Sequence, residues 1–168
     1  MKKTVTASLA RAGIIAGLYV ALGVITLPVM SGAIQFRASE GLCLLPLVMP
    51  ESVIGLFIGC LLSNVISGCA VYDVILGSLI TLVSAVCTLA IGKTALKPGV
   101  KIITGGLFPV IFNALFLPLI WLLCYGTTEY AYYLEVCFLL VSQSVSVYGV
   151  GAGVLAAHRA VYKKNKSE

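Results

Sequence analysis

The sequence is short of charge. Only 10% of its 168 residues are charged, whereas a soluble domain carries about 25%. Hydrophobic residues make up 60% of the chain, against about 45–50% in soluble proteins. This composition excludes a water-soluble globular domain, a disordered tail and a nucleic-acid-binding protein. It is typical of an integral membrane protein, whose surroundings are membrane lipid and which has no nucleic acid partner.

The sequence also lacks the groups that most catalytic and metal sites need. Its one histidine, His158, lies beside Arg159 at the end of the last apolar run, and no two cysteines form a Cys-x-x-Cys pair. Residues 92–94 (Gly-Lys-Thr) resemble the end of a phosphate-binding loop, but Cys87 stands where such a loop needs glycine. We therefore expect no ATP site, no metal, no cofactor and no enzymatic activity.

Long apolar runs are what the sequence does contain. They are unbroken, unlike the alternating strands of a membrane β-barrel, and a helix needs roughly 20 apolar residues to cross a bilayer. The sequence therefore predicts a single all-α membrane domain over residues 1–168, a bundle of six helices. The expected spans are 9–28, 38–50 (short), 52–68, 73–91, 102–124 and 131–158. The second is too short to cross alone, so we expect its neighbours to shield it.

The basic residues lie in three clusters, at the two termini and around residues 93–101, with Arg37 alone elsewhere. Such clusters beside apolar runs mark cytoplasmic loops. Six crossings would bring ten of the eleven basic residues to one side, so we expect both termini in the cytoplasm and the chain in the cell membrane. The first run has no small-residue cleavage site, and we expect it to stay as a span.

Polar side chains within the spans are candidates for a binding site, because each is costly in a membrane. Asn113 and Gln143 lie near the middle of the last two spans. Nearer the expected outer surface are Arg37, Glu40, Asn64, Asp73, Glu129 and Glu135. Simpler interpretations stay open: interhelical hydrogen bonds that only hold the bundle together, and an Arg37–Glu40 pair. Together these groups predict a cavity open to the outside, for a ligand that is cationic or rich in N–H donors.

Small residues recur along the first span at four-residue spacing. Ala12 and Ala16 form one row, and Gly13, Gly17 and Ala21 lie beside it. A face of small residues lets another helix backbone approach closely. The approaching helix belongs either to this bundle or to a second protein.

Four segments carry a family resemblance: 35–40 (Gln-Phe-Arg-Ala-Ser-Glu), 55–64 (Gly-Leu-Phe-Ile-Gly-Cys-Leu-Leu-Ser-Asn), 72–79 (Tyr-Asp-Val-Ile-Leu-Gly-Ser-Leu) and 112–114 (Phe-Asn-Ala). In these the chain resembles the QueT family of queuosine-precursor transporters, which are substrate-binding (S) components of energy-coupling factor (ECF) transporters. The resemblance implies a six-helix protein that captures a 7-deazaguanine, such as 7-aminomethyl-7-deazaguanine or queuine, from outside the cell. It also implies a transmembrane coupling subunit (EcfT-like) and two cytoplasmic ATPases as partners, with Ala12 and Ala16 docking on the coupling subunit.

The chemistry of such a ligand selects residues for its pocket. Acids and amides meet the N–H edge of a deazaguanine with paired hydrogen bonds, and a cationic aminomethyl arm calls for a carboxylate. We assign Glu40, Asn64, Asn113 and Gln143 to substrate binding, followed by Asp73, Glu135 and Arg37. Candidate walls for the ring are Phe36, Phe112, Trp121 and Tyr148. Ser142-Gln143 stands where the resemblance leads us to expect Gly-Glu, which leaves open whether the ligand is the cationic amine or a relative such as queuine.

Two other functions stay open. A stand-alone small-molecule membrane transporter would take up its substrate without ATP or partner proteins. An S component for another vitamin-like heterocycle would bind a different ligand in the same cavity. A membrane enzyme is disfavoured, because no reactive pair of side chains shares a depth in the membrane.

Overall fold

The described residues of the chain are helical. The computed structural model describes residues 5–29, 35–126, 128 and 130–167, and no strand occurs among them. In chain order the elements are α1 (Val5–Ile25), η1 (Leu27–Val29), η2 (Ala38–Leu47), α2 (Ser52–Ile66), η3 (Asp73–Gly77), α3 (Ser78–Gly92), α4 (Pro98–Ile120), η4 (Trp121–Tyr125), α5 (Tyr132–Ser144), η5 (Val145–Val150) and α6 (Gly151–Ser167). The η1 and η2 segments are 3₁₀ helices, and η3, η4 and η5 are π turns. The η3 and η5 turns continue into α3 and α6, and η4 ends the helix that begins as α4.

Four of the helical segments are long and apolar enough to cross a membrane. They are Val5–Ile25, Asp73–Gly92, Pro98–Tyr125 and Tyr132–Val161. The other two apolar helices, Ala38–Leu47 and Ser52–Ile66, are shorter. At about 2.0 Å per residue for a 3₁₀ helix and 1.5 Å for an α-helix, each rises only about 20 Å, less than a hydrocarbon core of about 30 Å. The chain is thus a multi-pass membrane protein, and the expected six crossings stay a prediction.

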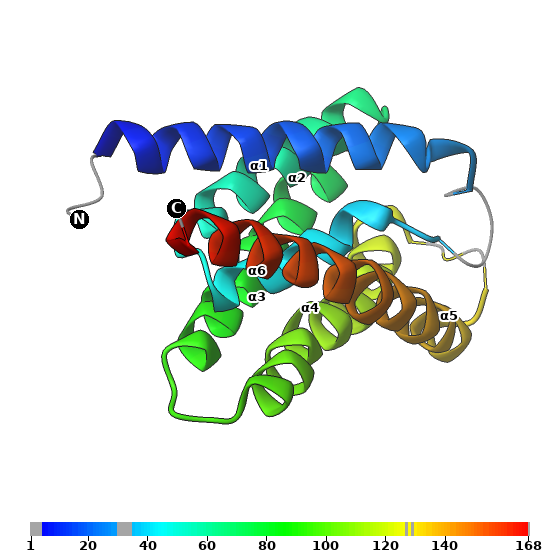
Figure 1. Ribbon diagram of the computed structural model, residues 1–168. Helices are drawn as coiled ribbons and strands as arrows, with labels where there is room; N and C mark the ends of the chain where they lie inside the picture. Colours follow the sequence, from blue (N-terminus) through cyan, green and yellow to red (C-terminus); the bar gives the residue numbers. More distant parts are fainter. Residues whose placement is uncertain (1–4, 30–34, 127, 129, 168) are drawn as a thin grey trace.

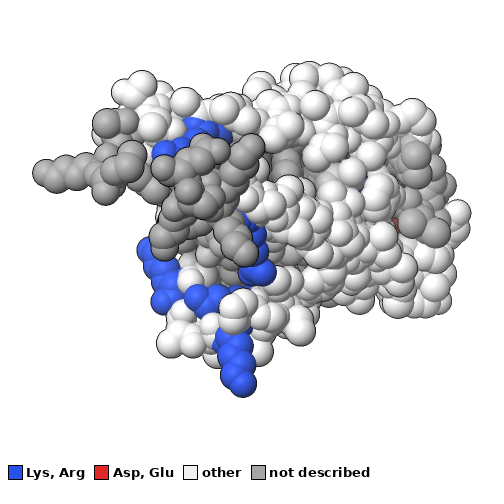
Figure 2. All heavy atoms as spheres, in the orientation of Figure 1, with Lys and Arg blue, Asp and Glu red and all other residues white. Residues whose placement is uncertain are grey.

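The surface of the described chain is apolar and its interior holds polar groups. Exposed aliphatic side chains such as Ile14, Ile103 and Leu123 cover the outer faces of the helices, whereas Glu40 and Asn113 are buried. The Lys and Arg side chains that Figure 2 shows in blue gather at one end, where α3 joins α4, whereas Arg37 lines a cavity inside the bundle. This distribution suits a bundle surrounded by lipid, with polar chemistry kept inside.

Helix α1 packs along α2 through small residues (Figure 1). A Cβ atom on Gly55 would lie 2.6 Å from the carbonyl oxygen of Ala12, and one on Gly59 would lie 3.1 Å from Cα of Ala16. Ala12 and Ala16 are consequently only 6% and 7% exposed. Within this bundle α2 covers the row, and the docking of Ala12 and Ala16 on a partner protein stays a prediction.

The short helix η2 runs through the middle of the bundle, where it contacts α1, α3, α4, α6 and η5 (Figure 1). All its residues from Ser39 to Pro46 are buried. The crossing with α6 is tight, because a Cβ atom on Gly151 would lie 2.7 Å from the carbonyl oxygen of Gly41. This central position carries Glu40 into the interior, away from lipid.

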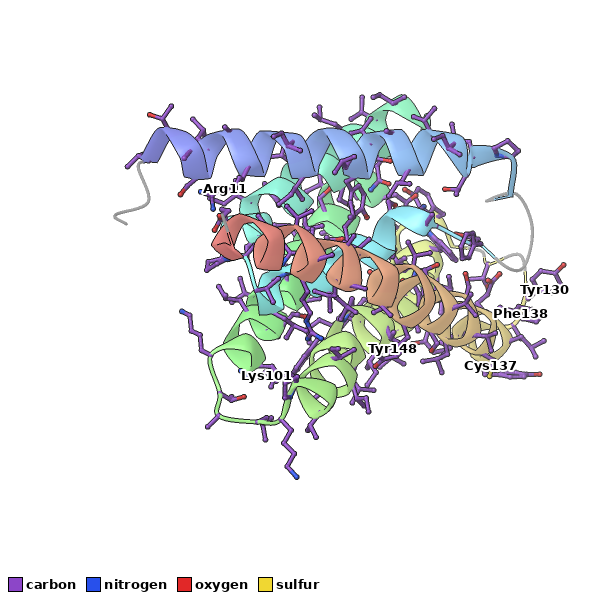
Figure 3. The ribbon with its side chains drawn as sticks, viewed as in Figure 1. Arg11, Lys101, Tyr130, Cys137, Phe138 and Tyr148 are labelled. Atoms are coloured by element: carbon purple, nitrogen blue, oxygen red, sulfur yellow. The ribbon has the colours of Figure 1, made fainter. Side chains whose placement is uncertain are left out.

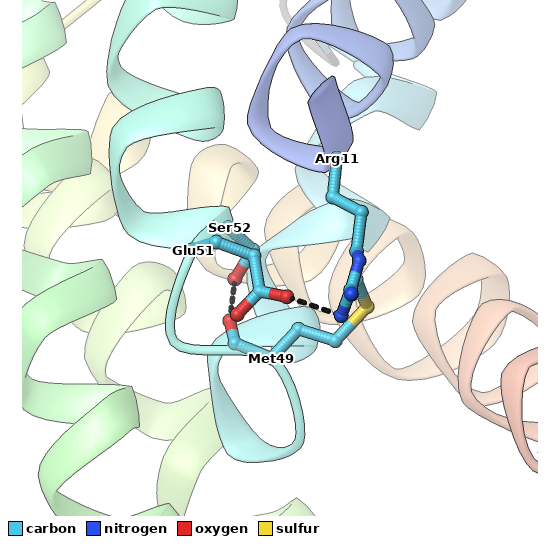
Figure 4. Close-up of polar contacts among 4 residues, drawn as sticks. All are labelled: Arg11, Met49, Glu51 and Ser52. Atoms are coloured by element: carbon cyan, nitrogen blue, oxygen red, sulfur yellow. Dashed lines mark hydrogen bonds and ion pairs between the residues drawn. The ribbon is translucent and has the colours of Figure 1, made fainter. Parts of the chain in front are cut away.

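An ion pair joins α1 to the start of α2 (Figure 4). Nη1 of Arg11 donates to Oε1 of Glu51 at 2.9 Å, and the Glu51 side chain is 7% exposed. Beside it, the Ser52 hydroxyl donates to the carbonyl oxygen of Met49 at 2.6 Å. Figure 3 places Arg11 and Lys101 toward one end of the molecule and Tyr130 at the other.

Candidate functional site

A cavity of about 230 Å³ lies inside the bundle, beside Glu40 of η2. Its lining residues are Gln35, Arg37, Glu40, Cys60, Asn64, Cys69, Asp73, Gly77, Thr81, Asn113, Leu117, Trp121 and Gln143. They come from η2 and the segment before it, from α2 and the segment after it, from α3, α4 and α5, and from the π turns η3 and η4. Six of the seven predicted substrate-binding residues line this one cavity, and only Glu135 lies outside it.

Glu40 is 2% exposed and its carboxylate receives hydrogen bonds from three side chains. The Tyr19 hydroxyl of α1 donates to Oε1. Nδ2 of Asn113 donates to Oε2 at 3.1 Å, and the Cys43 thiol lies 3.3 Å from the same oxygen. A buried carboxylate is tolerated when several donors compensate for its lost hydration. The three donors hold Glu40 in place and leave the group as an acceptor of further hydrogen bonds.

Two amides extend this network across the cavity. The Nδ2 atom of Asn113, on α4, also lies 3.3 Å from Oε1 of Gln143, on α5. Both residues are at most 3% exposed. The two amides form an interhelical hydrogen bond, which the sequence left open as the simpler interpretation, and both also line the cavity. Each amide has an oxygen acceptor and two N–H donors, so the pair can serve a bound ligand as well as each other.

A second hydrogen-bonded chain closes one side of the cavity. Nη1 of Arg37 donates to Oδ1 of Asn64 at 3.1 Å, and Nδ2 of Asn64 donates to the backbone carbonyl of Asp73 at 3.3 Å. The Asp73 carboxylate accepts from Nε1 of Trp121 at 2.9 Å and from the Tyr125 hydroxyl at 3.2 Å. Arg37 therefore bonds to Asn64 among the described side chains, and the Arg37–Glu40 pair that the sequence left open as a simpler interpretation is not one of the described ion pairs.

Two of the three π turns carry residues of this site. Asp73 and Gly77 lie in η3, and Trp121 opens η4. A π turn shifts the register of a helix by adding a residue to one turn, and such turns are frequent at functional sites. Here they bring Asp73 and Trp121 within hydrogen-bonding distance across two helices.

A second cavity, of about 350 Å³, adjoins the first. It is lined by Gln35, Ala70, Asp73, Trp121, Tyr125, Thr128 and Glu135. Gln35, Asp73 and Trp121 line both cavities, so the two share a wall. Glu135 lies in the first turn of α5 and is 3% exposed, and its Oε1 accepts from the backbone N–H of Tyr130 at 3.1 Å. Glu129 lies outside the described residues.

Sequence reasoning missed several residues of the site. The Tyr19 hydroxyl donates a hydrogen bond to the Glu40 carboxylate, and in the cavity wall the Thr81 hydroxyl donates to Sγ of Cys60 at 3.4 Å. Neither has a sequence signal, because Tyr and Thr are common on apolar helices. Of the four candidate aromatic walls only Trp121 lines the cavity. Phe112 instead lines an apolar groove between α3 and α4, and Tyr148 covers Gly106.

The chemistry of the site is that of a polar binding pocket. Its lining combines two carboxylates, one guanidinium and four side-chain amides with one indole. No group of three or more His, Cys, Asp and Glu side chains that could hold a metal ion occurs within the described ranges. Ordered acceptors and donors in a small buried space fix the orientation of a ligand through hydrogen bonds.

Comparison with known proteins gives one match. No curated protein and no solved structure matches the chain. The family model described as QueT transporter matches residues 9–159, nearly the whole length. The chain therefore belongs to the QueT transporter family and is a membrane transporter.

Proposed function

We propose that the chain is the substrate-binding component of an ATP-driven ECF importer and that it captures a queuosine precursor of the 7-deazaguanine class from outside the cell. The observation that carries this proposal is the cavity around Glu40, where a fixed carboxylate adjoins Asn113 and Gln143. Membership of the QueT transporter family supports the same substrate class.

The hydrogen-bonding groups of the cavity complement a deazaguanine. The pyrimidine edge of that ring has an N–H and an amino group side by side, with a carbonyl next to them. A carboxylate accepts two such donors in parallel, and an amide N–H meets the carbonyl. Glu40 supplies the carboxylate, and Asn113 and Gln143 supply amides beside it. The Trp121 ring in the wall offers a flat apolar surface for stacking.

The size of the cavity favours a compact ligand. Its volume of about 230 Å³ lies below the roughly 300–1,000 Å³ of pockets for drug-sized molecules. One fused two-ring heterocycle with a short substituent suits this space. This volume matches the fused ring, which 7-aminomethyl-7-deazaguanine and queuine share.

Binding by the purified protein tests this function. We expect 7-aminomethyl-7-deazaguanine to bind in isothermal titration calorimetry and to change the fluorescence of Trp121, the one tryptophan of the chain. Glu40→Gln should weaken binding about 10- to 150-fold, because a hydrogen bond to a charged group contributes about 1.5–3 kcal/mol. Glu51→Gln, at the Arg11 ion pair, is the matched control and should bind like the wild type. Wild-type protein that binds no deazaguanine would refute the proposal.

ATP-dependent coupling is the second part of the proposal. The phosphate-binding loop at 92–94 is incomplete, which is consistent with an energy supply from partner proteins: an EcfT-like coupling subunit and two ATPases. Vesicles that contain this chain alone should bind the deazaguanine without accumulating it, and vesicles with the whole complex should accumulate it when ATP is supplied. Flux through the chain alone would favour the stand-alone transporter instead.

A further inference from the structure

We infer that the second cavity is the subsite for a cationic amine substituent of the ligand and that Glu135 selects for its positive charge. This inference rests on the proposed function, since it assumes that the heterocycle occupies the first cavity. It adds the orientation of the ligand: the ring lies against Glu40 and its arm extends toward α5.

The two cavities are placed to hold two parts of one molecule. Gln35, Asp73 and Trp121 line both of them. A ring that stacks on Trp121 in the first cavity therefore has the second cavity directly beside it. The second cavity has about 350 Å³, which is ample for an aminomethyl group and its water.

Glu135 has an acceptor available for such a group. Its side chain is buried, with 3% exposure, and it lines the second cavity. Its one hydrogen bond among the described residues joins Oε1 to the Tyr130 N–H at 3.1 Å, so Oε2 has no partner there. Among the described residues, the one buried side-chain oxygen or nitrogen without a hydrogen-bond partner is Oγ of Ser146, so Oε2 of Glu135 is not sealed in the protein interior but belongs to the lining of the second cavity. An ammonium group in that cavity would find in Oε2 a charged acceptor.

The charged side chains that line the two cavities also favour a cation in the second cavity. Asp73 and Glu135 line the second cavity, and none of its described lining residues is a lysine or an arginine. The first cavity also has two carboxylates, but Arg37 offsets one of them. Both oxygens of Asp73 already accept hydrogen bonds, from Trp121 and Tyr125. A cationic arm is therefore favoured in the second cavity, with Glu135 as its direct partner.

Two ligands that differ only in charge test the assignment. They are 7-aminomethyl-7-deazaguanine, whose alkylamine is protonated at neutral pH, and its 7-cyano analogue, which is neutral. We expect Glu135→Gln to weaken binding of the amine about 10- to 100-fold and to leave binding of the nitrile within about twofold. Glu135→Asp should keep most of the preference for the amine, and Glu51→Gln should keep all of it.

A second substitution covers the case in which Glu135→Gln does not fold. Thr128→Lys places an ammonium group at the edge of the second cavity and should weaken binding of the amine alone. Equal losses for both ligands, or no loss for either, in a folded variant would overturn the inference while leaving the proposed function intact. A wild-type protein that binds neither ligand would instead refute the proposed function.

Discussion

Glu40 is a carboxylate in the interior of a membrane protein, and its surroundings explain how the fold tolerates it. An isolated charge there would be strongly destabilising. Tyr19, Cys43 and Asn113 all direct donors at its two oxygens. Each of these side chains is itself buried. The network is therefore a preformed acceptor whose geometry does not depend on a ligand.

Asn113→Ala tests how far the site depends on this network. The substitution removes a donor from Oε2 of Glu40 and the partner of Oε1 of Gln143. Oε2 of Glu40 then keeps only the Cys43 thiol, and a buried acceptor left unsatisfied, as at Gln143, costs about 1–3 kcal/mol. We therefore expect a lower unfolding temperature and ligand binding weakened at least about tenfold. Calorimetric titration and thermal unfolding in detergent measure the two effects. Thr104→Ala, which alters only an exposed hydroxyl on the same helix, is the control; unchanged affinity in Asn113→Ala would remove Asn113 from the binding site.

At the scale of the elements, the pairing of α1 with α2 decides which residues of α1 remain available. Ala12 and Ala16 lie against Gly55 and Gly59 of α2. The adjacent side of α1 is exposed and offers a second row of small residues, made of Gly13, Gly17 and Ala21. A Cβ atom on Gly13 or Gly17 would meet nothing within 4 Å.

Two glycine-to-alanine substitutions compare the α1–α2 interface with the exposed side of α1. Gly59→Ala puts a Cβ atom 2.7 Å from Cβ of Tyr19, and the helices must move apart at a cost of about 1–3 kcal/mol. Gly17→Ala meets open space and should stabilise α1 by up to about 1 kcal/mol through helix propensity. Thermal unfolding in detergent should give opposite signs for the pair. A Gly59→Ala variant as stable as the wild type would contradict the close packing.

The exposed row is also where we propose that the coupling subunit docks, in place of Ala12 and Ala16. Gly17→Leu should prevent co-purification with the coupling subunit and leave ligand affinity unchanged, because a large side chain blocks close approach of another helix. Ala16→Leu should instead loosen the bundle itself. A complex that still assembles with Gly17→Leu would rule out docking on this row.

At the scale of the whole molecule, the distribution of basic residues gives the bundle two unlike ends. Arg11 and Lys101 lie toward one end (Figure 3). Arg159 lines the same small pocket as Lys101, and Lys93 and Lys97 lie in the loop between α3 and α4 that precedes Lys101. The loop before α5 and the second cavity, with Asp73 and Glu135, form the other end. Basic loops stay in the cytoplasm. This end-to-end asymmetry supports the proposal that the cavities open to the outside.

Lysine labelling tests this orientation without altering the chain. Every lysine lies in one of the three predicted cytoplasmic clusters. A membrane-impermeant amine reagent should therefore leave the protein unmodified in intact cells and modify it in broken membranes. Ala131→Lys places an amine at an exposed position before α5 and should make intact cells reactive. Labelling of the unaltered chain in intact cells would contradict the proposed topology.

The membrane class, the helical fold and most of the site residues could be predicted from the sequence. Each depends on local properties: apolar runs long enough to span, and the rarity of polar groups within them. Because so few polar residues occur in the spans, Glu40, Asn64, Asn113 and Gln143 stood out as candidates, and the structure gathers them around one cavity. Residues with ordinary side chains, such as Tyr19 and Thr81, gave no such signal.

The family resemblance and the set of polar residues within the spans were thus determined by the sequence alone. Which face of α1 is buried, which residue partners Arg37, and that Glu135 belongs to a second cavity were decided only by the tertiary structure. The sequence alone does not distinguish two rows of small residues on adjacent faces of one helix. Which row is packed inside the bundle depends on where the glycines of α2 lie. Contacts such as that between Asp73 and Trp121 join residues far apart in the chain, and their geometry depends on π turns and on helix packing that no local pattern specifies.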